Sequence, residues 1–82
     1  MFDTVLRVYE LMGIYGLSLM ELCQRCDIHH STITTTKKRG GQLSLDTVKR
    51  ICDGLGITMA EFFMNSDEEK RYNIDWNKKA AG

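Results

Sequence analysis

The residues best suited to chemistry gather between positions 23 and 30. Cys23 and Cys26 form a C-x-x-C pair, and His29 and His30 follow almost directly. Thiolates and imidazoles are zinc ligands, and Cys52 could complete such a set. However, the chain has no second pair at a matching spacing, and Cys23 and Cys26 recur with apolar residues at helical intervals. Because cysteine packs well as a small apolar residue, we expect core cysteines, no metal and no cofactor.

Serine, threonine, histidine and cysteine side chains are also potential nucleophiles and bases. No nucleophile, base and orienting group can be placed together from this sequence. A chain of 82 residues forms one domain and buries only about 60% of its unfolded surface, which leaves no room for a large catalytic cleft. Three cysteines are an odd number and do not indicate a disulfide framework. We therefore expect a protein that is not an enzyme.

Apolar periodicity predicts an all-α fold of five helices, and no alternating pattern typical of a strand stands out before residue 65 except around Ile33. The expected helices span approximately residues 3–12, 18–27, 29–37, 44–56 and 58–63. Ser18 with Glu21 and Thr58 with Glu61 have capping-box spacing. The residues expected on buried faces are Phe2, Val5, Leu6, Tyr9 and Met12 in the first helix, Leu45, Val48, Ile51, Cys52 and Leu55 in the fourth, and Met59, Phe62 and Phe63 in the last.

The segment 29–37 has a composition unlike the others. Its only apolar member is Ile33, and small polar side chains surround it. A helix with one apolar anchor offers its outer face to a partner, as a helix that enters the DNA major groove must do. The run Thr34–Thr36 by itself favours a strand, because β-branched residues disfavour helix.

Charge is balanced over the whole chain but not along it. Lys and Arg number 11, and so do Asp and Glu. Between residues 16 and 43 the sequence has four basic and two acidic residues, a net charge of +2. Such a polarised distribution can direct one face toward phosphate, with modest electrostatic affinity.

Five short motifs follow one another at the spacing of a known family. They are LS and EL within residues 17–22, I-x-x-STI at 28–33, SLDTV at 44–48, LGIT at 55–58 and EFF at 61–63. The chain resembles the Cro and phage-repressor family of helix-turn-helix regulators, of the xenobiotic-response-element type, without gaps from Gly16 to about Phe63. The resemblance implies a compact, lambda-repressor-like DNA-binding domain with five helices.

The resemblance also implies a site. The segment 29–37 would be the reading helix in the major groove of double-stranded DNA. Base contacts would come from His30, Ser31, Thr32, Thr34 and Thr35, and phosphate contacts from Ser18, Lys38, Arg39 and Ser44. The protein would regulate transcription as a homodimer in the cytoplasm, with no membrane contact and no small-molecule ligand. Protonation of the two histidines would strengthen DNA binding at acidic pH.

Three positions depart from the family pattern. Leu19 stands where relatives often carry a glutamine that grips phosphate, Asp27 replaces the glycine of the corner, and His29 replaces the usual Ser or Thr cap of the reading helix. These departures bear on the individual contacts. The neutral net charge and the threonine-rich reading helix, whose β-branched residues disfavour helix, favour an alternative function. In that alternative, the same fold is a protein-interaction module, such as an antitoxin-like or phage accessory protein, that does not read DNA.

The chain is expected to divide into a helix-turn-helix domain at residues 1–65 and a C-terminal extension at 66–82, partly packed and partly disordered. Its spacing is compatible with a sixth helix or with a strand. In either case Tyr72, Ile74 and Trp76 would cover the domain's own core or a dimer interface.

Overall fold

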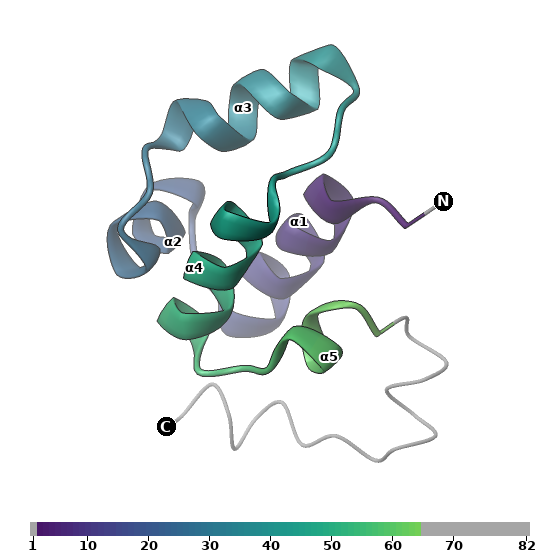
Figure 1. Ribbon diagram of the computed structural model, residues 1–82. Coiled ribbons are helices and arrows are strands. Elements are labelled where there is room, and N and C mark those ends of the chain that lie inside the picture. Colours follow the sequence, from purple (N-terminus) through teal and green to yellow (C-terminus); the bar gives the residue numbers. More distant parts are fainter. Residues whose placement is uncertain (1, 65–82) are drawn as a thin grey trace.

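The computed structural model describes residues 2–64, and this part of the chain is all-helical, as predicted (Figure 1). Its five helices are α1 (Thr4–Tyr15), α2 (Leu19–Cys26), α3 (His30–Arg39), α4 (Leu45–Leu55) and α5 (Met59–Phe62). In Figure 1, α3 lies across one end of the molecule, and α5 lies at the opposite end. The predicted reading helix of about 29–37 is therefore α3, which is two residues longer at its C-terminus and has His29 as its N-cap.

Local hydrogen bonds set the helix boundaries. Both predicted capping boxes, Ser18 with Glu21 and Thr58 with Glu61, are present. At every N-cap a side chain accepts a hydrogen bond from a backbone N–H of the first turn, at Asp3, Ser18, His29, Ser44 and Thr58. Residues in the left-handed conformation end the first four helices, at Gly16, Asp27, Gly40 and Gly56.

The helix α1 is longer than predicted. It continues through Gly13 to Tyr15 instead of ending at Met12, and Gly16 closes it with a φ of 67°. A glycine inside a helix costs about 1 kcal/mol relative to alanine. The last turn is held by Tyr15, whose hydroxyl donates to the Leu55 carbonyl oxygen of α4 at 3.2 Å. A tertiary contact therefore extends the helix past the glycine.

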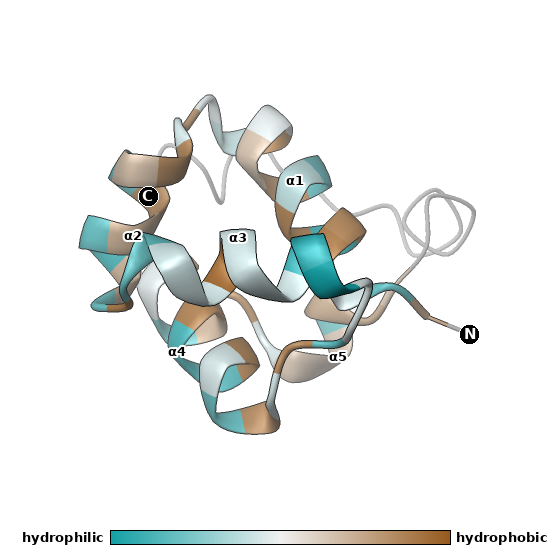
Figure 2. Ribbon diagram, turned by 90° about the horizontal axis from the view of Figure 1, so that it is seen from above, coloured by the Kyte–Doolittle hydropathy of each residue, from teal (hydrophilic) through white to brown (hydrophobic). Residues whose placement is uncertain are grey.

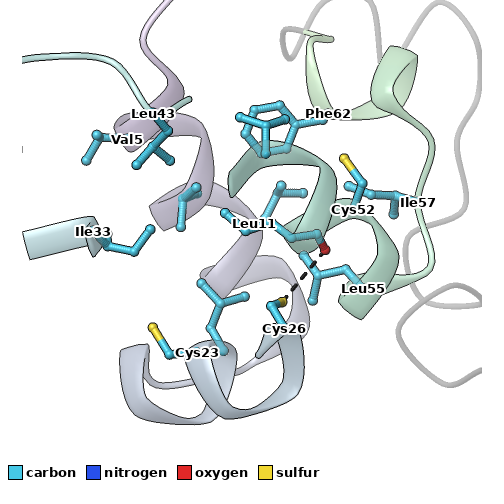
Figure 3. Close-up of a cluster of buried hydrophobic side chains, with 14 residues drawn as sticks. Val5, Leu11, Cys23, Cys26, Ile33, Leu43, Cys52, Leu55, Ile57 and Phe62 are labelled. Carbon is cyan, nitrogen blue, oxygen red and sulfur yellow. Dashed lines mark hydrogen bonds between the residues drawn. The ribbon is translucent and has the colours of Figure 1, made fainter. Parts of the chain in front are cut away.

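The core lies between α1, α2 and α4, with α3 and α5 closing its two ends (Figure 3). Its buried apolar residues are Val5, Val8, Leu11, Leu22, Cys23, Cys26, Ile33, Leu43, Val48, Ile51, Cys52, Leu55, Ile57 and Phe62. The three cysteines are among them, as predicted, and all three are free thiols.

Two residues predicted for the core are on the surface instead. Leu6 is 58% exposed, because the inward stripe of α1 runs through Val8 and Leu11, both fully buried. Leu45 is 71% exposed, and Leu43, just before the N-cap of α4, is buried instead. In α1 the buried face is rotated relative to the predicted one. In α4 the predicted face is correct, because Val48, Ile51, Cys52 and Leu55 are buried and only Leu45 at its start is exposed.

Phe63 was also predicted to be buried and is 38% exposed. It follows the last residue of α5, and its ring packs at 5.1 Å from Phe2 and 5.2 Å from Phe62. Phe62 alone of these three is fully buried. The aromatic cluster therefore joins the start of the described chain to its end.

Two close contacts hold the helices together. A Cβ atom at Gly54 of α4 would lie 2.5 Å from the Cys26 sulfur and 2.8 Å from the Cys26 Cα atom, so α2 and α4 approach closely here. Arg7 of α1 is only 2% exposed. Its Nε donates to the Phe62 carbonyl oxygen at 2.7 Å, and its Nη2 donates to that of Glu61 at 2.8 Å. This guanidinium satisfies the carbonyl groups at the end of α5.

Among residues 2–64 no helix has the length and apolarity needed to cross a membrane. The predicted C-terminal extension 66–82, with its helix or strand and its Tyr72, Ile74 and Trp76, lies outside the described residues.

Candidate nucleic-acid interface

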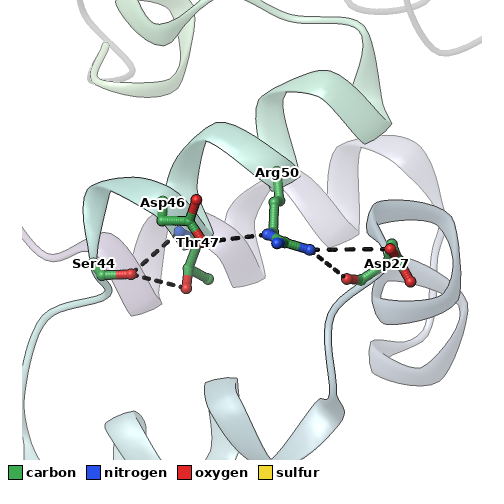
Figure 4. Close-up of polar contacts among 5 residues, drawn as sticks. All are labelled: Asp27, Ser44, Asp46, Thr47 and Arg50. Atoms are coloured by element: carbon green, nitrogen blue, oxygen red, sulfur yellow. Dashed lines mark hydrogen bonds and ion pairs between the residues drawn. The ribbon is translucent and has the colours of Figure 1, made fainter.

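The corner between α2 and α3 is built around Asp27. This residue ends α2, at the predicted position, in the left-handed conformation with a φ of 56°. Arg50 of α4 reaches across to it: Nη1 donates to the Asp27 carbonyl oxygen at 3.3 Å and lies 3.9 Å from its carboxylate (Figure 4). The Nε of Arg50 donates to the Asp46 carboxylate at 3.2 Å. The helix α4 thus supports the corner that sets the direction of α3.

Sequence reasoning did not identify this role of Arg50. The i, i+4 spacing of Asp46 and Arg50 is visible in the sequence and indicates an ion pair on one helix face. The contact with Asp27 joins residues 23 positions apart, and no local pattern indicates it.

The helix α3 is anchored by two side chains. Ile33 is fully buried, and Thr36 is 5% exposed with its hydroxyl donating to the Thr32 carbonyl oxygen at 2.7 Å. All five predicted base-contact residues are exposed: His30, Ser31, Thr32, Thr34 and Thr35. In Figure 2, which looks down on α3, the helix lies across this face of the molecule. It is mostly pale, with one hydrophobic band in its middle and a strongly hydrophilic C-terminal end.

Side chains directly opposite Ile33 point away from the protein. At 100° per residue, Ser31, Thr35 and Lys38 fall on that outward line, spaced i, i+4 and i+7. Thr34 and Thr32 lie on the flanks, and all of these side chains are exposed. Four of the five predicted base-contact residues, Ser31, Thr32, Thr34 and Thr35, therefore lie on the outer surface and flanks of α3. His30 lies about 60° from Ile33 around the helix and lines the groove beside α2.

The hydroxyls on this surface are not equivalent. The Thr34 hydroxyl donates back to its own helix. Its oxygen lies 3.3 Å from the His30 carbonyl oxygen and 3.5 Å from the Ser31 carbonyl oxygen. Within residues 2–64, the hydroxyls of Thr32 and Thr35 make no hydrogen bond. Thr32 and Thr35 are thus the hydroxyls most available to a partner.

His29 caps α3 with its imidazole. Its Nδ1 accepts the Ser31 backbone N–H at 3.2 Å and lies 2.6 Å from the Ser31 hydroxyl oxygen. The His30 ring stacks on the His29 ring with centroids 4.6 Å apart. The substitution of the usual cap by His29 therefore preserves the cap and adds a bond to a predicted reader.

An open groove lies beside these histidines, between α2 and the start of α3. Its volume is about 410 Å³, and it is lined by Met20, Cys23, Gln24, Asp27, Ile28, His29 and His30.

The basic end of α3 divides into two parts. Lys37 is held against the protein, because its Nζ lies 4.5 Å from the centre of the Tyr9 ring of α1. Lys38 and Arg39 are exposed and form no ion pair with any residue between 2 and 64. These two are the side chains predicted to contact phosphate, and they remain available for it. The Lys37–Tyr9 contact, 28 residues apart, has no sequence signal.

Ser18 and Ser44, the other predicted phosphate contacts, are exposed but already act as caps. The Ser18 oxygen accepts the Glu21 N–H at 3.2 Å, and the Ser44 oxygen accepts the Thr47 N–H at 3.2 Å. The Ser18 backbone N–H donates to the Glu21 carboxylate and is the main cause of its lowered pKa, and the Ser18 side chain contributes a smaller effect in the same direction. Glu21 and Asp46 place a carboxylate in the first turn of α2 and α4. Phosphate would meet less positive charge here than at an uncapped helix end.

The cysteines do not form a metal centre in the described part of the chain, where no group of three or more His, Cys, Asp or Glu side chains is arranged to hold a metal ion. Burial raises the pKa of Cys23 and Cys52, and it raises that of Cys26 to about 11. These thiols stay protonated at neutral pH and serve as core residues.

The chain matches a known family. The family model of the Cro/C1-type helix-turn-helix DNA-binding domain matches residues 7–67, which include all five helices except the first turn of α1. Neither the curated proteins nor the solved structures give a match.

Proposed function

Since this chain belongs to the Cro/C1-type helix-turn-helix DNA-binding domains, we propose that it is a sequence-specific transcriptional regulator that places α3 in the major groove. One observation carries the proposal: α3 buries only Ile33 and Thr36 and exposes the remainder of its side chains. A helix with side chains is about 10–12 Å across, which matches the major groove width of about 12 Å.

We assign base contacts to Ser31, Thr32, Thr34 and Thr35 on the outer surface and flanks of α3, and to His30 at its start. The hydroxyls of Thr32 and Thr35 make no hydrogen bond within residues 2–64, and threonine methyl groups suit the thymine methyl. Lys38 and Arg39 would bind phosphate at one end of this surface. Ser18 and Ser44 would contribute the free N–H groups of their helix ends, with less affinity because each end carries a carboxylate.

The regulator would act in the cytoplasm as a homodimer on paired half-sites about one helical turn apart. The reading unit would be residues 1–65, with 66–82 as an extension. We propose no catalytic role and no cofactor.

Salt-dependent binding tests this function. Fluorescence anisotropy with a random-sequence duplex at several salt concentrations should give a log–log slope that flattens by about 0.9 for each lost phosphate contact. Lys38→Ala with Arg39→Ala should flatten the slope by about two units and weaken all sequences alike. Lys49→Ala, which removes an exposed charge on α4 that is paired with Asp53 at 2.7 Å, is the matched control and should leave the slope unchanged.

A second candidate function is a protein-interaction module with the same fold. It is favoured by the net charge of zero and by the carboxylates of Glu21 and Asp46 at the two helix ends. Such a module would show no salt-dependent DNA binding, so the same titration decides between the two.

A further inference from the structure

We propose that His29 fixes the hydrogen-bonding polarity of Ser31, so that Ser31 accepts a hydrogen bond from the exocyclic amino group of adenine or cytosine. The inference rests on the proposed function, because it requires α3 to lie in the major groove. His29 would be a positioning residue, since it acts on DNA only through Ser31.

The first step is the protonation of the His29 ring. Its Nδ1 accepts the backbone N–H of Ser31 at 3.2 Å. A backbone N–H can only donate, so Nδ1 carries no proton and the neutral ring has its proton on Nε2. The cap itself therefore determines the tautomer.

The second step concerns the Ser31 side chain. Its oxygen lies 2.6 Å from the same Nδ1, well within hydrogen-bond distance. Because Nδ1 is unprotonated, the hydroxyl is the donor in this contact. The hydroxyl proton of Ser31 is thus used inside the protein, and only its oxygen lone pairs remain for a partner.

The third step is the match with a base edge. A free hydroxyl rotates to donate or accept and discriminates little between bases. In the major groove the donors are the adenine N6 and cytosine N4 amino groups, while guanine N7 and O6 and thymine O4 only accept. Ser31 points outward, opposite Ile33, and is exposed. Held by His29, it would select an amino group at the base that it contacts.

Thr35 supplies the comparison within the same helix. It lies on the same outward line as Ser31, and its hydroxyl makes no hydrogen bond within residues 2–64. Its hydroxyl can therefore both donate and accept. The preference for an amino group should be confined to the base pair that Ser31 contacts.

The test begins with selection of binding sites from a random-sequence duplex library by the full chain. The base pair read by Ser31 is the one whose preference disappears in Ser31→Ala. At that pair, the amino group is removed by replacing adenine with purine, or cytosine with pyrimidin-2-one. In a second duplex the N7 acceptor is removed with a 7-deazapurine.

Removal of the amino group should weaken wild-type binding about three- to tenfold, and removal of N7 should have little effect. Ser31→Ala should be insensitive to both changes, and Thr35→Ala should behave as wild type at this pair. His29→Ser keeps a residue that caps helices well but frees the Ser31 hydroxyl. In this variant, removal of the amino group and removal of N7 should therefore weaken binding equally.

Each other result overturns the proposal. If no sequence is enriched and no duplex is bound, both the proposed function and this inference are wrong. If a sequence is selected but removal of N7 costs as much as removal of the amino group, only this inference is wrong. The same holds if His29→Ser retains the full preference of the wild type.

Discussion

The helices α3 and α4 are nearly equal in length but are used in opposite ways. Of its ten residues α3 buries two, Ile33 and Thr36, whereas α4 buries five of its eleven. A helix that buries a wide apolar face gains stability from packing, and one that buries little depends on its neighbours. The helix α4 therefore supports the fold and the corner between α2 and α3, while α3 leaves its outer surface exposed to a partner.

The largest expected effect comes from the single apolar anchor of α3. Ile33→Ala should lower the free energy of unfolding by about 3 kcal/mol, because it empties a fully buried site. Thr35→Ala, on the opposite side of the same helix, should change it by less than about 0.5 kcal/mol. Urea unfolding followed by circular dichroism measures both. Equal effects of the two substitutions would contradict the assignment of an inner and an outer face.

The next effect tests α4 as the supporting helix. Gly54→Ala should lower the free energy of unfolding by about 2 kcal/mol, because the new Cβ would meet the Cys26 backbone at 2.8 Å. Gly13→Ala is the matched control: it is also inside a helix, has no atom within 4 Å of the added Cβ, and should stabilise the protein by about 0.5–1 kcal/mol. Thermal unfolding of the two variants should move in opposite directions. If Gly54→Ala were as stable as Gly13→Ala, the close contact of α2 and α4 would be wrong.

A smaller effect is expected where α4 supports the corner. Arg50→Ala removes the hydrogen bond to the Asp27 carbonyl oxygen, and a partly exposed contact of this kind contributes about 0.5–1 kcal/mol. Lys49→Ala is the control, because it removes an exposed i, i+4 ion pair with Asp53 that lies entirely within α4. No measurable change in the free energy of unfolding is expected. Amide hydrogen exchange of α3 should rise in the first variant only. Equal exchange in both would show that Arg50 does not support the corner.

Much of the fold could be predicted from the sequence because its signals are local. The capping boxes at Ser18 and Thr58, both predicted, each involve residues within one turn of a helix. The buried stripes were predicted less well. Leu6 and Leu45 are apolar but lie outside the core, because residue type alone does not fix which side of a helix meets its neighbours.

The candidate site shows the same limit. The exposed surface of α3 was predictable from the scarcity of apolar residues around Ile33 and from the family pattern. The contacts of Lys37 with Tyr9 and of Arg50 with Asp27 join distant parts of the chain. The bond of His29 to Ser31 is local, but it depends on a ring orientation that the sequence does not specify.

If the outer surface of α3 reads base edges, substitutions on it should change the ratio of two dissociation constants. The ratio compares a random-sequence duplex with a duplex selected by the wild-type protein. Ser31→Ala with Thr35→Ala should reduce it by about tenfold or more, while affinity for the random duplex stays within about twofold, because phosphate contacts carry no sequence information. A ratio that is unchanged in this double variant would contradict the account.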